Sequence, residues 1–334
     1  MAVFACTSIR SAVSRLRLNG STITTQSIVD RAGARRNAPP LDIITSRREL
    51  VSNTSTLALS CKNQSGLVAL VSAYLAGHGA DITDLQQYAD PISGNFFMRA
   101  EFDCGSADPA KVRADFQAIA DEHSMKWSLR EPGYMPKVVL MVSKFDHALG
   151  DLLYRMRIGE INMEVVAIIN NHPREVLTTS LIGDIPYHHF PITKDTKPQQ
   201  EAQIKQVVTE TGADLVVLAR YMQILSDDMA SFLNGRCINI HHSFLPGFKG
   251  AKPYHQAYKR GVKMIGATSH YVTEDLDEGP IIAQDVAICS HRETPDQLVA
   301  KGRDVERRVL AKAVKAHLED RVFLNGARTV VFES

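Results

Sequence analysis

The sequence has little cysteine and no paired cysteine motif. Its five cysteines are scattered over 334 residues, and no two of them form a Cys-x-x-Cys pair. Small secreted proteins use a dense and even set of cysteines as a disulfide framework, and closely spaced cysteines mark many zinc sites. Neither pattern is present, which favours a protein of a reducing compartment.

The sequence also lacks an excess of charge of either sign and any long apolar run. Lys and Arg number 38 against 37 Asp and Glu, for a net charge of +1. Nucleic acids and anionic membranes attract basic proteins, so this balance gives no reason to expect either partner. No apolar run approaches the ~20 residues of a transmembrane helix. A hydrophobic content of 44% and the length favour an ordinary globular protein of two domains.

The first 37 residues lack lysine and contain one acid, Asp30, although they hold six arginines. Ser and Thr are abundant there, and Ile9, Val13 and Leu16 recur at near-helical spacing. Such a segment is typical of an organellar transit peptide, and a disordered basic tail is the alternative. We therefore expect a transit peptide over residues 1–37, a linker over 38–54, and a mitochondrial location, with the chloroplast as the second choice.

Residues 55–132 contain short strand and helix patterns in the order βαββαβ. Strands are expected at 56–61, 82–89, 96–102 and about 125–129, and helices at 66–79 and 109–123. This order predicts a ferredoxin-like module.

Residues 136–334 change to an alternation of strands and helices, which predicts a mostly parallel, Rossmann-like sheet with helices on both faces. The expected strands are 137–142, 165–170, 187–189, 215–218, 237–240 and 262–271, and the expected helices are 147–156, 198–211, 226–233 and 295–318. Thr294 is expected to cap the last helix. The fold class is therefore α/β, with an N-terminal ferredoxin-like domain.

The chemistry is expected where the strand at 237–240 runs into a loop rich in Pro and Gly. Asn239 and His241 are two residues apart, so they point to the same side of an extended segment, and His242 points away. Open α/β sheets place ligands at this end of their strands. An amide can stabilise an oxyanion and an imidazole can transfer a proton. A metal pair at His241 and His242 is the rival interpretation, without a third ligand at a recognisable spacing.

A second motif, His-Tyr-Val-Thr-Glu-Asp-Leu-Asp-Glu-Gly-Pro-Ile-Ile, begins at His270. Together with Asn-Ile-His-x-Ser-x-Leu-Pro from Asn239, it resembles the formyltetrahydrofolate formyltransferase and hydrolase superfamily. Within it, the chain is most similar to the deformylase family over roughly residues 55–332. That family hydrolyses 10-formyltetrahydrofolate to formate and tetrahydrofolate, without a cofactor or metal, in one-carbon and purine metabolism.

The resemblance assigns catalysis to Asn239, His241 and Asp277. It places His270 near the active site, although a purely structural histidine is an equal alternative. Residues 216–225 resemble the folate-binding strand and loop, which implies that Met222, Gln223 and Leu225 contact the substrate. Gly250 belongs to the loop 247–253, which is expected to cover the acceptor side.

The N-terminal module resembles the ACT domain, which often pairs and often binds amino acids. We therefore expect a homo-oligomer formed through this module and an amino-acid effector. The usual Asp-x-Pro-Gly turn is Asn63-Gln64-Ser65-Gly66 here, so only the glycine is retained.

Two other functions stay open at this point. One is a formyltransferase with an amine acceptor, and the other is a catalytically idle ACT protein that senses a ligand. The loop 143–150 lacks the glycine run with which related nucleotide transferases hold a phosphate. This departure favours water as the acceptor, and hence hydrolysis.

Overall fold

The computed structural model describes residues 54–105, 108–247 and 253–334. The expected transit peptide at 1–37, most of the linker and Gly250 lie outside these ranges. Among the described residues, no helix has both the length and the apolar character needed to cross a membrane.

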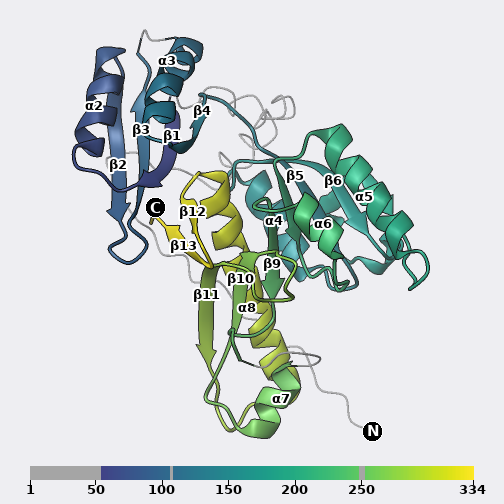
Figure 1. Cartoon of the computed structure of the whole chain (residues 1–334). Coiled ribbons are helices and arrows are strands. Elements are labelled where there is room, and N and C mark those ends of the chain that lie inside the picture. Colours follow the sequence, from purple (N-terminus) through teal and green to yellow (C-terminus); the bar gives the residue numbers. More distant parts are fainter. Residues whose placement is uncertain (1–53, 106–107, 248–252) are drawn as a thin grey trace, which may run out of the picture. The chain divides into compact units, whose positions relative to one another are not determined.

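The N-terminal part contains the predicted βαββαβ order (Figure 1). Its sheet is antiparallel in the order β2-β3-β1-β4. Gly66 precedes the first helix with a φ of 90°, a conformation that residues with a side chain rarely adopt, which explains why this glycine is retained at the turn. The elements are β1 (Thr54–Lys62), α2 (Leu67–Gly77), β2 (Asp81–Ala89), β3 (Asn95–Asp103), α3 (Pro109–Glu122) and β4 (Lys126–Arg130).

The second part is built on a seven-stranded sheet in the order β11-β10-β9-β8-β5-β6-β7. Five strands run parallel, whereas β10 and β11 are antiparallel to their neighbours. The predicted Rossmann-like class is therefore confirmed. Its strands are β5 (Lys137–Val142), β6 (Glu164–Asn170), β7 (Tyr187–His189), β8 (Leu215–Leu218), β9 (Cys237–His241), β10 (Met264–Tyr271) and β11 (Ile281–Ile288).

Helices cover both faces of this sheet. One face is buried by α4 and α8, whose apolar side chains join those of the strands in one core, and the other face is buried by α5 and α6. Thr294 caps α8 as predicted and forms a reciprocal capping box with Gln297. The helices are α4 (His147–Arg157), α5 (Lys197–Thr211), α6 (Asp227–Phe232), α7 (Pro253–Arg260) and α8 (Pro295–Leu318).

Among the α-helices and strands of the described residues, those not expected from the sequence are α7, β11 and the hairpin of β12 (Val322–Asn325) and β13 (Arg328–Val331). Helix α7 is only eight residues long and directly follows the Pro/Gly loop. Strand β11 is an edge strand whose exposed and buried residues do not alternate regularly. Short elements with weak periodicity give little signal in a single sequence.

Candidate active site

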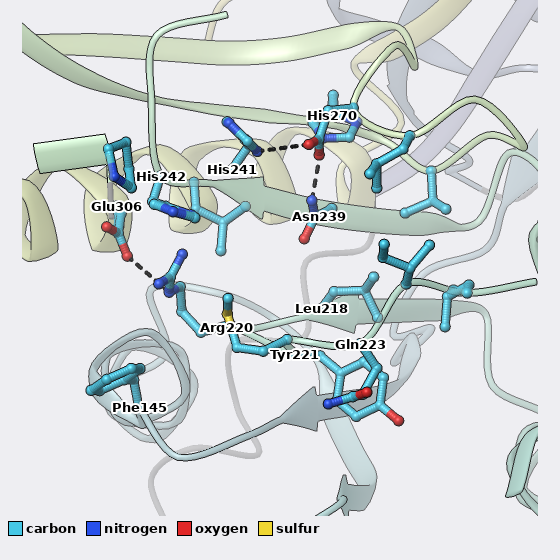
Figure 2. A pocket seen from close by; sticks show the side chains of 18 of the residues that line it. Phe145, Leu218, Arg220, Tyr221, Gln223, Asn239, His241, His242, His270 and Glu306 are labelled. Atoms are coloured by element: carbon cyan, nitrogen blue, oxygen red, sulfur yellow. Dashed lines mark hydrogen bonds and ion pairs between the residues drawn. The ribbon is translucent and has the colours of Figure 1, made fainter. Parts of the chain in front are cut away.

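The ends of β8 and β9 and the loop after β10 enclose a cavity of about 810 Å³ (Figure 2). Asn239 and His241 both line it, as the alternation along β9 predicted. Asp277 and His270 line it as well. The residues that the sequence assigned to catalysis thus come together in one cavity, on elements far apart in the chain.

The position of Asp277 depends on the turn between β10 and β11. Its own backbone has a φ of 58°, in the left-handed region that Asp tolerates better than most residues. Two residues later, a Cβ atom built on Gly279 would lie 1.8 Å from the carbonyl oxygen of Tyr271. The turn can therefore close on β10 only with glycine at this position.

Asp277 contacts two imidazoles. Its Oδ2 lies 3.2 Å from Nδ1 of His241, and its Oδ1 lies 3.6 Å from Nε2 of His270. Partial burial acts to raise the pKa of Asp277, but hydrogen bonds and charge from the two histidines outweigh it and hold that pKa well below its usual range. Asp277 is therefore an anion that orients His241.

The other ring nitrogen of His241 is the chemically available atom of the site. Nε2 is buried and has no hydrogen-bond partner among the described residues. A buried nitrogen without a partner is costly unless a ligand or water completes it. With Nδ1 held by Asp277, Nε2 can take a proton from a water molecule or give one to a leaving group.

His270 holds the amide of Asn239. Its Nδ1 lies 2.8 Å from the carbonyl oxygen of Tyr271, which can only accept a hydrogen bond. This contact places a proton on Nδ1. A protonated ring directs Nε2–H toward Oδ1 of Asp277, and in the neutral ring Nε2 accepts from Nδ2 of Asn239 at 3.3 Å. One hydrogen on Nδ2 of Asn239 is then bonded to His270. Because this bond fixes the plane of the amide, it also sets the direction of the second Nδ2 hydrogen.

The segment expected to bind folate also lines the cavity, through Met222, Gln223 and Leu225. The backbone N–H of Met222 already donates to Oγ of Ser143 at 3.0 Å, so this donor is engaged within the protein. The side chain of Met222 is half exposed, and Leu225 packs beside the core of the sheet. The segment can therefore offer an apolar wall and some, though not all, of its backbone groups.

Sequence reasoning misplaced His242. It was expected to point away from the cleft, but it lines the cavity and stacks on His241, with ring centroids 5.2 Å apart. The alternation rule fails here because β9 ends at His241, so His242 is already in a turn. Burial, with the positive charge of Arg220, lowers the pKa of His242 to about 4.

The sequence analysis also missed a charged cluster at one end of the cavity. Its centre is Glu306 on α8, a carboxylate only 1% exposed. Burial acts to raise the pKa of Glu306, but a hydrogen bond from His147 and the charge of Arg220 lower it by more. The sequence signal was an acid on the apolar side of a helix, with Val305, Val309 and Leu310 around it.

The described residues hold no group of three His, Cys, Asp or Glu side chains arranged to bind a metal ion. Gly250 cannot be placed relative to the cavity, since the loop 248–252 lies outside the described ranges.

Comparisons with known proteins identify related sequences and structures. Residues 136–314 match the model of the formyl transferase family. The chain is 52% identical to the formyltetrahydrofolate deformylase of Corynebacterium sp. (strain P-1) over 277 residues, which cover 82% of this chain and 96% of that protein. It is 46% identical to the enzyme of that name from Bacillus subtilis (strain 168), over 83% of this chain and 93% of the relative.

A solved structure extends the likeness to three dimensions. The crystal structure of formyltetrahydrofolate deformylase from Burkholderia mallei superposes with a TM-score of 0.80 at 51% identity, over 84% of this chain and 99% of that one. Because this match covers residues of both domains, it supports the two-part fold as a whole.

The expected organellar location is wrong. Relatives come from Corynebacterium, Bacillus subtilis, Synechocystis and Escherichia coli, and these bacterial sources contradict the expectation of an organellar protein. The arginine-rich composition of the first 37 residues misled the prediction, since composition alone does not establish targeting.

Proposed function

This chain belongs to the formyltetrahydrofolate deformylases of the formyl transferase family, and we propose that Asn239, His241 and Asp277 carry out its reaction. That reaction is the hydrolysis of 10-formyltetrahydrofolate to formate and tetrahydrofolate. The observation that carries the assignment is the state of His241. Its Nδ1 is held at 3.2 Å by the Asp277 carboxylate, while its buried Nε2 lacks a partner among the described residues.

The first step is attack of water on the formyl carbon. Nε2 of His241 accepts a proton from the water as the new C–O bond forms, and the Asp277 carboxylate stabilises the resulting imidazolium. The formyl oxygen becomes an oxyanion. The second Nδ2 hydrogen of Asn239 donates to it, and such a donor contributes roughly 3–4 kcal/mol in comparable sites.

The second step is cleavage of the C–N10 bond. The electron pair of that bond passes to N10, which takes the proton from Nε2 of His241, and the carbon leaves as formate after losing its remaining acidic proton. His270 does not touch the reacting atoms in this scheme. Its contact with Nδ2 of Asn239 sets the direction of the oxyanion donor.

Met222, Gln223 and Leu225 are proposed to hold the flat pterin ring against the end of β8. Support comes from their place on the cavity wall. Gly250, in the loop 247–253, is proposed to close the acceptor side.

The N-terminal residues 55–132 are proposed to be an ACT-like domain, separate from a catalytic domain over 136–334. Within the part of the chain that the structure describes, β2 and β4 are the edge strands of the N-terminal sheet, and a second copy of the chain can pair with such an edge. We propose a homo-oligomer formed in this way, with an amino acid as effector. Light scattering on the full-length protein is the test, and a monomer mass at micromolar concentration would contradict it.

The reaction itself is tested by incubating the purified protein with 10-formyltetrahydrofolate and measuring both products. Hydrolysis predicts equal amounts of formate and tetrahydrofolate without an added amine. Turnover that requires an amine acceptor would instead indicate a transferase, and absence of turnover under all conditions would indicate an idle ligand sensor.

A further inference from the structure

The cavity continues past the catalytic residues into a cluster that the proposed chemistry leaves without a role. Figure 2 shows Arg220, His242 and Glu306 together on one side of the cavity, whereas Leu218 and Gln223 lie on the other side. We call this set the Arg220 cluster. Its members are His147, Arg220, His242, Tyr254 and Glu306.

Glu306 is already satisfied by donors other than Arg220. The hydroxyl of Tyr254 donates to Oε1 at 2.6 Å, and Nε2 of His147 lies 2.8 Å from Oε2. Both carboxylate oxygens therefore have a close partner. The Arg220 guanidinium is near the same carboxylate, with Nε 3.3 Å from Oε2, but this pair lacks the angle of a hydrogen bond.

Arg220 is thus a buried cation that pairs with Glu306 by charge but makes no hydrogen bond to it through Nε. Its side chain is only 10% exposed, and Nε has no hydrogen-bond partner among the described residues. An arginine carries five donors in a planar fork, and burial without partners costs free energy. Such a group in a cavity wall is suited to a ligand with two coplanar oxygen acceptors.

The backbone at Arg220 indicates that its position is constrained. Its φ is 66°, in the left-handed region, two residues after the end of β8. A residue with a long side chain rarely adopts this conformation, and such residues concentrate at ligand sites. The turn directs the guanidinium into the cavity beside His242, which itself stacks on the proton-transferring His241.

We propose that Arg220 is the binding site for the carboxylate product, formate, and that it accepts other small monocarboxylates more weakly. The proposal rests on the hydrolase function described above. Hydrolysis converts the neutral formyl group and water into an amine, formate and a proton, so a carboxylate with two equivalent oxygens forms only as the C–N10 bond breaks. Arg220 receives the two formate oxygens and so separates formate from the tetrahydrofolate amine.

The decisive experiment is a titration of the protein with sodium [¹³C]formate at constant ionic strength, followed by NMR line width. Formate has three non-hydrogen atoms, so a dissociation constant on the order of millimolar is expected. Arg220→Met should weaken binding at least about tenfold, and Arg220→Lys should weaken it less, because a charge remains without the planar fork. His241→Ala is the matched control and should retain formate binding.

Kinetics supply a second readout. Formate should inhibit the wild-type protein as a product, and Arg220→Met should raise the inhibition constant at least about tenfold while the KM for 10-formyltetrahydrofolate changes less than about threefold. Acetate should compete more weakly than formate, and chloride should not compete. A folded Arg220→Met or Arg220→Lys protein that binds formate like wild type would overturn the proposal. So would a wild-type protein that shows no binding at a formate concentration 100 times the expected dissociation constant of about 1 mM.

The NMR measurement keeps the two hypotheses apart because it needs no turnover. If the wild-type protein binds formate through Arg220 but hydrolyses nothing, the carboxylate site stands and the reaction assignment fails. If the protein hydrolyses the substrate but Arg220→Met leaves formate binding unchanged, the reaction assignment stands and the carboxylate site fails.

Discussion

Nδ1 of His241 and Oδ2 of Asp277 lie 3.2 Å apart, although His241 ends β9 and Asp277 lies in the turn between β10 and β11, with a left-handed backbone. Nδ1 of the imidazole is thus held by the carboxylate, whereas Nε2 has no hydrogen-bond partner among the described residues. The proposed proton transfer depends on that difference, and so do the effects expected of substitutions here.

Replacing His241 or Asn239 by alanine should lower kcat at least ~100-fold, the usual scale for a lost proton-transfer group or oxyanion donor. The double substitution should cost little more than either single change, since the two groups act as a unit. Steady-state kinetics with thermal melts as folding control measure this. Near-normal turnover by a folded His241→Ala protein would contradict the mechanism.

His270→Gln should lower kcat by about tenfold, less than the loss in Asn239→Ala, because it removes a contact of the Asn239 amide and of the Asp277 carboxylate but leaves both of those groups in place. KM should stay close to wild type. The His270→Gln/Asn239→Ala protein should be no slower than Asn239→Ala alone, and additive losses would show that His270 acts independently of Asn239.

The titration of His242 should make stability depend on pH. Its pKa is lowered to about 4 by burial and by Arg220, so between about pH 6.5 and 4 the unfolded chain binds a proton that the folded protein does not. Stability contributed by neutral His242 is therefore lost as pH falls through this window. His242→Gln should therefore reduce the slope of the unfolding free energy against pH over the same range, as measured by urea unfolding. The reduction is at most that of one proton, or about 1.4 kcal/mol per pH unit.

His291→Gln serves as the control for this measurement, since His291 is exposed. It should leave the pH dependence unchanged. If wild type and His242→Gln show the same slope of unfolding free energy against pH, groups other than His242 account for the pH dependence.

Gly302→Ala tests the packing behind Glu306. A Cβ atom at this position would lie 2.2 Å from Cζ of Tyr254, so Tyr254 must move away from the carboxylate that it contacts. We expect a loss of about 1–3 kcal/mol in stability, as for other overpacked sites. Gly150→Ala in α4 is the matched control.

The alanine methyl at position 150 would lie 3.5 Å from Oγ1 of Thr179, which is an ordinary contact. Alanine also favours a helix over glycine, so this variant should melt at or above the wild-type temperature. Equal melting temperatures for Gly302→Ala and wild type would contradict the packing argument.

The sequence predicted the parts of the molecule that follow from regular periodicity. Alternation along β9 placed Asn239 and His241 on one side, and the Thr294 cap set the start of α8 at the correct residue. The resemblance selected Asp277 among four nearby acids. Local patterns and specific motifs were sufficient in these cases because each depends on only a few neighbouring residues.

The remainder depends on contacts between distant segments. Glu306 and Tyr254 are 52 residues apart in the chain, and Arg220 meets them only once β8, α7 and α8 are folded together. His242 was misplaced because the exact end of a strand decides which way a side chain points. Composition likewise suggested an organelle for a chain whose relatives are bacterial.

Gly279 limits how this scaffold can diversify. With the Tyr271 carbonyl 1.8 Å from any Cβ, the position is closed to nineteen of the twenty amino acids while the turn keeps its path. A library aimed at new acceptors or altered substrates can therefore vary the cavity wall freely around residues 222–225, but it has to hold residue 279 fixed. Substitution of Gly279 would displace the turn that positions Asp277, so activity would be lost although no catalytic group had changed.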